Sequence, residues 1–153
     1  MSIRHGSKRA SARSLRAQTQ EPQAVPQAPI RDPRVKIVVD LLRSNLHRRI
    51  RLAELAEVTN LSTFYLSSLF KTETGLPPGE YFRRLKMEKA RCLLATSLLS
   101  VKQIMGEVGY NTKNHFARHF RKSFGVAPSE YRKKERLILM AKSDRAARNR
   151  KIG

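Results

Sequence analysis

Two stretches of the sequence place polar, basic and aromatic side chains at intervals of three and four residues. The two sets are Phe64, Ser67, Ser68 and Lys71, and then Asn114, Ala117, Arg118 and Arg121. Residues at these intervals share one face of an α-helix. Asparagine can pair with adenine and arginine with guanine, each through two hydrogen bonds. The second face therefore has the chemistry needed to read base edges in a DNA groove.

The first face offers weaker chemistry of the same kind. Serine hydroxyls can contact any base, and Phe64 could press against a thymine methyl group. We therefore expect the second face to provide more hydrogen-bonded specificity and the first to depend on shape and apolar contact. Two alternatives stay open: Phe64 could fold back into a core, and Arg118 and Arg121 could be ordinary solvated charges.

The opposite sides of these stretches are apolar, as a helix that packs on one side requires. With about 100° per residue, Leu69 and Phe70 lie within about 60° of Leu66. In the second stretch, the inner face consists of Phe116, His119 and Phe120. We expect His119 and its neighbour His115 to pack or cap rather than to catalyse.

The two stretches belong to a unit that occurs twice. Leu55-Ala56-Glu57-Val58 returns 49 residues later as Ile104-Met105-Gly106-Glu107. The segment from Leu66 to Tyr81 returns 50 residues later, from Phe116 to Tyr131, with its Gly, Pro and Glu positions retained. One extra residue therefore sits in the second copy, near 111–113. A duplicated unit of this length is one supersecondary element used twice.

Helix signals recur along the chain, and no segment alternates as a strand would. Asp32-Pro33 is typical of a helix start, Ser100 is a further N-cap, and Gly75 and Gly125 end helices. The expected helices cover about 33–44, 52–57, 62–72, 79–96, 101–108, 112–124, and a last one from Pro128 or Ser129. The sequence thus predicts an all-α fold of about seven helices.

Within each copy, a short helix, a turn and a second helix follow one another, which is the helix-turn-helix arrangement. We expect two such subdomains joined by a long linker helix. The predicted divisions are a disordered basic tail (1–34), a first subdomain (35–75), the linker helix (76–98), a second subdomain (99–134) and a basic C-terminal extension (135–153).

Composition favours a polyanionic partner. Lys and Arg number 32 against 12 Asp and Glu, a formal net charge of +20. Cys92 is the sole cysteine, expected on a buried helix face, and the four histidines are not expected to hold a metal ion. We expect no enzyme activity, cofactor or metal, no membrane span and a cytoplasmic (nucleoid) location, although an Arg- and Ser-rich start also suits a transit peptide.

The repeated residues resemble those of the AraC/XylS family of bacterial transcription regulators. The resemblance is carried in the second unit by Ile104-Met105-Gly106-Glu107-Val108-Gly109-Tyr110 and by the segment from Asn114 to Arg132, and in the first by Leu55-Ala56, Leu61-Ser62, Tyr65-Leu66, Leu69-Phe70-Lys71, Gly75, Pro78 and Tyr81. It covers about residues 35–134. It implies that the second helix of each unit enters a major groove, the two grooves being successive on one face of DNA.

The resemblance also implies which positions contact bases. These are Phe64, Ser67, Ser68, Lys113, Asn114, Ala117 and Arg118. We expect phosphate contacts from Ser62, Lys71, Asn111, Arg121 and Lys122. Two residues depart from the family pattern: Ser68 stands where relatives often have a longer side chain, and Met105 stands where a small residue is usual.

The leading hypothesis is a sequence-specific transcription regulator, an activator, that binds double-stranded DNA as a monomer at an asymmetric site. The second hypothesis is a nonspecific nucleoid-associated or RNA-binding protein that acts through its basic tails. Because about 34 tail-like residues precede the first unit, we predict no small-molecule effector. The run Leu137-Ile138-Leu139-Met140 is either the apolar side of the last helix, which we favour, or a contact for RNA polymerase or another partner.

Overall fold

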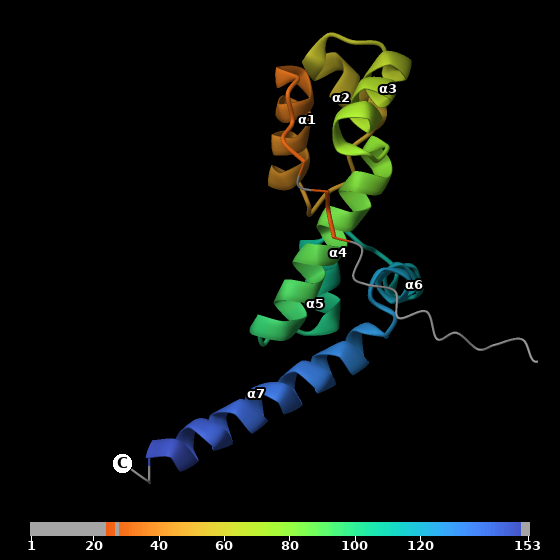
Figure 1. Ribbon diagram of the computed structural model, residues 1–153. Coiled ribbons are helices and arrows are strands. Elements are labelled where there is room, and N and C mark those ends of the chain that lie inside the picture. Colours follow the sequence, from red (N-terminus) through yellow and green to blue (C-terminus); the bar gives the residue numbers. More distant parts are fainter. Residues whose placement is uncertain (1–23, 27, 151–153) are drawn as a thin grey trace, which may run out of the picture.

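Seven α-helices make up the protein in its computed structural model, which describes residues 24–26 and 28–150 (Figure 1). They are α1 (Pro33–Ser44), α2 (Leu52–Thr59), α3 (Thr63–Thr74), α4 (Pro78–Thr96), α5 (Val101–Glu107), α6 (Lys113–Phe124) and α7 (Pro128–Arg150). The described residues contain no strand. The expected all-α class with two helix-turn-helix units and a long central helix is confirmed.

Helix boundaries follow the local signals closely. Asp32, Ser62 and Ser100 are N-caps whose side chains accept a backbone N–H from the first turn of α1, α3 and α5. At the other end, Gly75 and Gly125 close α3 and α6 with φ of +78° and +77°. Only glycine adopts this left-handed conformation without a steric penalty from Cβ. The ends of these helices are therefore set by capping residues that can be recognised in the sequence.

Helices α2 and α3 each end about two residues later than expected, and the last helix reaches Arg150. α2 continues through Val58 to Thr59, where the Thr59 hydroxyl donates to the carbonyl of Leu55, and Asn60 then turns the chain with φ of 52°. α7 continues without a break across position 135 to Arg150. Its Lys, Arg, Glu, Leu and Ala residues are good helix formers, and no Gly or Pro interrupts them.

The duplication is visible in the packing. In the first copy, the edge of Phe70 on α3 meets the ring of Tyr81 on α4, with ring centroids 5.2 Å apart. In the second, Phe120 on α6 meets Tyr131 on α7 in the same manner at 5.7 Å. Each aromatic pair thus packs the second helix of a helix-turn-helix unit against the helix that follows it, as the repeat predicts.

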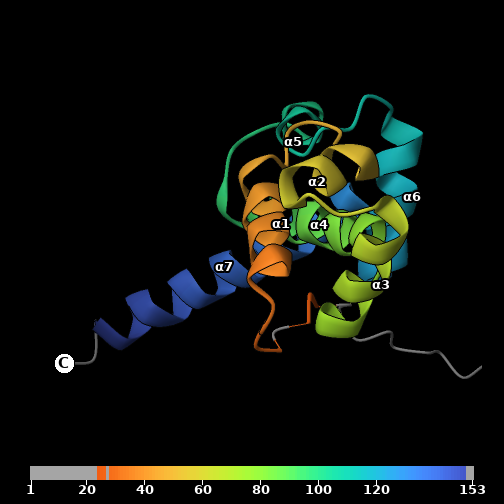
Figure 2. The same cartoon turned by 90° about the horizontal axis from the view of Figure 1, so that it is seen from above.

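Helix α4 belongs to both subdomains. Tyr81 and Phe82 in its first half pack with α1, α2 and α3, whereas Met87, Ala90 and Leu94 in its second half pack with α5 and α6. Figures 1 and 2 show α4 at the centre, with α3 and α6 on the same side of it in both views. Since two separate cores are built on one continuous helix, α4 fixes how far apart the two units lie.

The segment before α1 differs in part from the expected disordered tail. Residues 1–23 and 27 lie outside the described residues, so the prediction for them stays a prediction. Val25 and Ile30, however, are partly buried against the first core, and the backbone N–H of Arg31 donates to Glu73 at 2.7 Å. Isolated apolar residues among Gln and Pro give no periodic signal, which is why the sequence did not indicate this packing.

Cys92 is exposed, so the expectation that it lies on a buried helix face was wrong. It is adjacent to Leu93 and close to Leu94, but only Leu94 is fully buried, because α4 turns Cys92 away from the second core.

Within the described part of the chain, no helix is both long and apolar enough to cross a bilayer.

Candidate nucleic-acid interface

The outer face of α3 (Phe64, Ser67, Ser68 and Lys71) lies in solvent along most of its length. The side chain of Phe64 is 86% exposed, which excludes the alternative that it packs into the first core. Ser68 and Lys71 are also exposed, and Ser67 is half-buried. On the inner side, Leu66 and Phe70 are fully buried and Leu69 is half-buried, as expected.

The outer face of α6 (Asn114, Ala117, Arg118 and Arg121) is the matching surface of the second unit. Asn114, Arg118 and Arg121 are exposed, Ala117 is half-buried, and together with Lys122 they line one shallow hollow on the helix. Phe116 and Phe120 are buried on the opposite side. The amphipathic division that the sequence predicts is therefore present in α6, and its outer side chains are available to a partner.

The residues expected at phosphates lie at the ends of these faces. Lys122 on α6 is exposed, as is Asn111 in the turn before it. Lys113, which is expected at a base rather than at a phosphate, is also exposed at the start of α6. The Ser62 oxygen accepts the backbone N–H of Tyr65 at 3.2 Å, so this serine caps α3 and keeps its own hydroxyl proton free to donate. These placements fit the predicted roles, but contact with DNA stays a prediction for every one of them.

The extra residue of the second copy is located in the turn between its two helices. Asn60 and Leu61 correspond to Gly109 and Tyr110, because Leu61 and Tyr110 donate to the equivalent carbonyls of Ala56 and Met105. Asn111 is then the added residue. The N-caps also differ: Ser62 caps with its side chain, whereas Thr112 makes no side-chain cap hydrogen bond.

The two subdomains meet at a tight joint around Gly109. A Cβ atom there would lie 2.7 Å from the carbonyl oxygen of His47 and 3.0 Å from Nζ of Lys86, and φ is +67°. Lys86 is only 6% exposed and donates to the carbonyl of Arg48 at 2.9 Å. One α4 side chain and one glycine thus connect the loop after α1 to the turn before α6.

Lys86 is an unusual group to bury. Its ammonium lies 4.5 Å from the centre of the Phe82 ring, a cation–π contact that compensates part of the lost hydration. Burial first, and the nearby charge of Arg49 second, lower the pKa of Lys86 to about 8. The ammonium group of Lys86 in this joint therefore loses its proton at a lower pH than an exposed lysine does.

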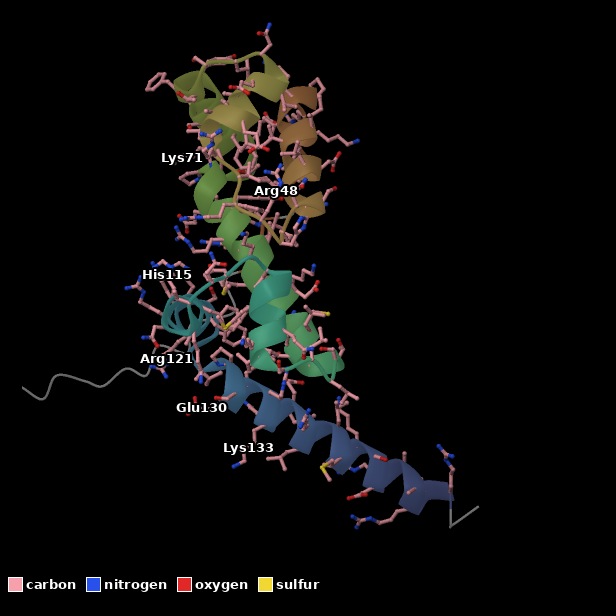
Figure 3. The ribbon with its side chains drawn as sticks, turned by 180° about the vertical axis from the view of Figure 1, so that it is seen from behind. Arg48, Lys71, His115, Arg121, Glu130 and Lys133 are labelled. Atoms are coloured by element: carbon pink, nitrogen blue, oxygen red, sulfur yellow. The ribbon has the colours of Figure 1, made fainter. Side chains whose placement is uncertain are left out.

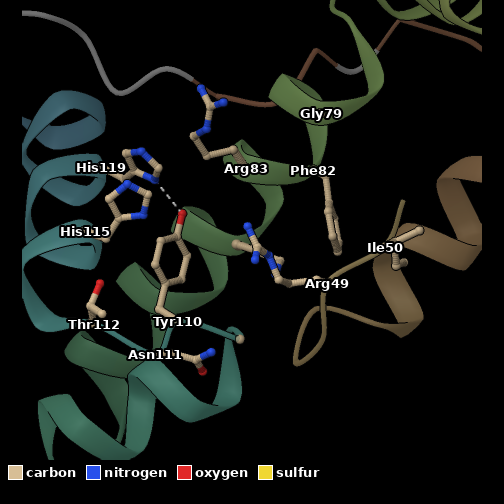
Figure 4. A pocket seen from close by; sticks show the side chains of 12 residues that line it. Arg49, Ile50, Gly79, Phe82, Arg83, Tyr110, Asn111, Thr112, His115 and His119 are labelled. Carbon is tan, nitrogen blue, oxygen red and sulfur yellow. Dashed lines mark hydrogen bonds between the residues drawn. The ribbon is translucent and has the colours of Figure 1, made fainter. Parts of the chain in front are cut away.

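Beside this joint lies a cleft between α4 and α6, which we call the junction cleft, of about 470 Å³. Its charged and aromatic lining consists of Arg49, Phe82, Arg83, Lys86, Tyr110, His115 and His119. In Figure 4 the two imidazoles project from α6 on one side and Arg49 and Phe82 lie on the other, with Arg83 at one edge. The Tyr110 hydroxyl and Nδ1 of His119 are hydrogen-bonded at 2.7 Å.

The charged side chains that line the cleft are all basic. Burial lowers the pKa of His119, and the positive charge of Arg83 lowers it further. Burial raises the pKa of Tyr110. The residues that line the cleft within the described chain include no Asp or Glu. His119 thus packs and hydrogen-bonds as expected, in a site whose surplus of positive charge the sequence did not reveal.

Arg49 and Arg83 could not be identified as functional candidates from the sequence. Neither belongs to a recognition helix, and each is one of many basic residues in the chain. A weak signal existed in Arg83, because it follows buried Tyr81 and Phe82 on a helix that was expected only to link the two units. Nothing in the sequence brings Arg49, which is 34 positions earlier, to the same cleft.

Comparison with known proteins identifies this architecture. A family model described as a helix-turn-helix domain matches residues 55–134. In sequence, the chain is 41% identical over 95 residues to the MmsAB operon regulatory protein of Pseudomonas aeruginosa. The aligned segment covers 62% of this chain and 31% of that protein. The chain spans about a third of the length of the curated relatives it matches.

Solved structures agree with the sequence comparison. The DNA-binding domain of AdpA, determined in complex with a target DNA, has a TM-score of 0.66 and 28% identity, over 70% of this chain and 96% of that one. A transcriptional regulator with an AraC-type DNA-binding domain from Chromobacterium violaceum has a TM-score of 0.63 and 28% identity, over 67% and 92% of the two chains. With its two helix-turn-helix units on a shared central helix and a family match over more than half of its sequence, the chain belongs to the AraC/XylS family.

Proposed function

We propose that the protein is a sequence-specific transcription regulator that inserts α3 and α6 into successive major grooves of double-stranded DNA. The observation that carries the proposal is the pair of exposed outer faces, from Phe64 to Lys71 and from Asn114 to Arg121, on one side of α4. The structural likeness to a domain solved with its target DNA supports it. The chain acts in this proposal by binding, not by catalysis.

The two outer faces differ in chemistry, so the site they read is asymmetric and one chain suffices to occupy it. Asn114 and Arg118 supply the hydrogen-bonded readout, whereas Phe64 supplies apolar contact. We therefore include monomeric binding in the proposal. Double-stranded DNA as the partner also supports a cytoplasmic location at the nucleoid.

Activation through RNA polymerase is a further part of the proposal. Figure 1 shows α7 projecting away from the side that carries α3 and α6. Leu137, Ile138, Leu139 and Met140 on this helix are between 38% and 65% exposed. Because all four side chains are exposed, they are not buried against the rest of the described chain and are accessible to a partner. A reporter assay with Leu137→Ser and Met140→Ser should show lost activation with unchanged DNA binding.

Selection of bound duplexes from a random pool, followed by binding measurements, tests the main proposal. We expect one preferred asymmetric sequence. Arg118→Ala should weaken binding by about 1–3 kcal/mol and relax the preference at a single base pair. Lys102→Ala, which removes an exposed charge on α5, is the matched control and should leave the preference intact. Equal binding of selected and random duplexes would exclude sequence-specific regulation.

Deletion separates this function from nonspecific binding through the basic tails. The N-terminal deletion should stop at residue 23, because Val25 and Ile30 pack on the first core and Asp32 caps α1. A variant that lacks 1–23 and 140–153 should retain its site-specific footprint. Loss of all DNA binding in that variant would favour the tails as the binding element.

A further inference from the structure

The junction cleft contains positive charge that no carboxylate among the described residues neutralises. The five ion pairs among the described residues use Arg34, Arg48, Arg84, Lys89 and Arg91. Within that part of the chain, Arg49, Arg83 and Lys86 therefore have no carboxylate partner. Like charges held together destabilise a folded protein unless a bound anion offsets their repulsion.

The cleft also provides donors suited to an anion. Arg49 and Arg83 are exposed and carry planar guanidinium groups, which match the geometry of phosphate oxygens. On the α6 side lie the imidazole of His115 and the side chain of Asn111, the residue that the second copy has in excess of the first. Donors from three separate segments thus line one cavity.

The position of the cleft indicates where the anion comes from. Figure 3 shows Lys71 of α3, His115 and Arg121 of α6 along one side of the molecule, with His115 between the other two. When two helices occupy successive major grooves on one face of DNA, a sugar-phosphate backbone must pass between them. His115 also lines the cleft, so the cleft opens between the two recognition helices, where this backbone would pass.

We propose that the junction cleft binds a backbone phosphate of the DNA where the duplex passes between α3 and α6, with Arg49 and Arg83 as the principal contacts. The inference rests on the function proposed above. Such a contact is independent of base sequence, so it contributes affinity and fixes the register of the two recognition helices. It also gives α4 a direct role in binding, beyond that of a connector.

A salt titration with the selected duplex tests the two arginines. Arg49→Gln and Arg83→Gln should each reduce the slope of log affinity against log salt by about 1, because one phosphate contact and its released counterion are lost. The preference for the selected sequence over single-base variants should not change. Lys102→Gln removes the same charge from α5 and should leave the slope as in the wild type. Equal slopes for all four proteins would overturn the proposal.

Neutral methylphosphonate linkages locate the contact. Placed one at a time between the two half-sites, they should weaken wild-type binding at one or two positions. At those positions Arg83→Gln should lose no further affinity, since the phosphate and the arginine are then partners in one interaction. Additive losses at every position would contradict the assignment. Because both arginines are exposed and each substitution removes one of several like charges, the variants should be no less stable to unfolding than the wild type.

A free phosphate compound in solution is the alternative ligand for the cleft, because it presents the same oxygen atoms as the DNA backbone. Calorimetric titration of the full chain with inorganic phosphate should show weak binding that the selected duplex abolishes. Tight phosphate binding that persists on DNA would overturn the backbone assignment. Failure of the selection to yield any preferred sequence would reject the proposed function itself. A preferred sequence combined with unchanged salt slopes would reject only the cleft.

Discussion

A Cβ atom on Gly109 would lie 2.7 Å from the carbonyl oxygen of His47, although the two residues belong to different subdomains. This close approach holds the turn before α6 against the loop after α1. The two recognition helices are consequently positioned by a backbone contact between the subdomains as well as by α4.

Gly109→Ala should destabilise the protein and weaken its binding to a two-groove site. The left-handed φ of Gly109 costs an alanine about 1–2 kcal/mol, and the clash with His47 adds about 1–3 kcal/mol. Gly125→Ala is the matched control, since Gly125 has φ of +77° and nothing within 4 Å of the added Cβ. Denaturant unfolding and duplex binding measure both effects. Equal free energies of unfolding for the two variants would show that the structure accommodates the added Cβ at position 109 without an energetic cost.

Lys86 should make stability rise with pH in the mildly alkaline range. Its pKa is near 8 when folded and near its ordinary value of 10.5 when unfolded, so the unfolded chain binds more protons between these values. The free energy of unfolding should therefore gain roughly 2–3 kcal/mol from pH 8 to 10.5 through this group. The comparison is urea unfolding of wild type and Lys86→Met across that range. Parallel curves for the two proteins would contradict the assignment.

Phe64→Ala should weaken DNA binding without loss of stability. Phe64 is 86% exposed, so its removal should change the free energy of unfolding by less than about 0.5 kcal/mol. Phe116→Ala makes the same chemical change at a fully buried position and should cost about 3–5 kcal/mol. Unfolding and duplex-binding measurements on both variants separate the two roles. Unchanged affinity in Phe64→Ala would remove this residue from the interface.

Ser62 permits a test that separates its capping role from its predicted phosphate contact. Ser62→Ala removes the cap of α3 and should cost about 1 kcal/mol of stability. Ser62→Asp retains the cap, since aspartate is an equally good N-cap, but places a negative charge where a phosphate is expected. It should keep wild-type stability and bind duplex more weakly. Wild-type affinity in Ser62→Asp would argue that Ser62 serves the helix alone.

Much of the fold could be predicted from particular residues. Asp32-Pro33 and Ser100 begin helices, and Gly75 and Gly125 end them, because capping depends only on the first or last turn. The inner and outer faces of α3 and α6 followed from helical periodicity. The extension of α2 to Thr59 and the exposure of Cys92 were missed, since the end of a short helix and the rotation of α4 depend on tertiary contacts.

Some residues of the candidate interface could likewise be predicted from the sequence, and others could not. Asn114, Arg118 and Phe64 could be placed on outer faces because each is a few residues from the apolar side chains that face inward. Arg49 and Arg83 could not be placed, because the cleft that they share exists only once both subdomains have folded onto α4. The packing of Val25 and Ile30 on the first core is likewise a contact between distant segments.

The sequence by itself determined that two homologous helical units exist, where the capped helices begin, and which side of each recognition helix is free. These properties depend on spacing within a few turns of one helix. The tertiary structure alone decided the distance and angle between the units, the burial of Lys86 beside Gly109, and the positive cleft between α4 and α6. Those features depend on side chains that are far apart in the chain and meet only when both cores close on one shared helix.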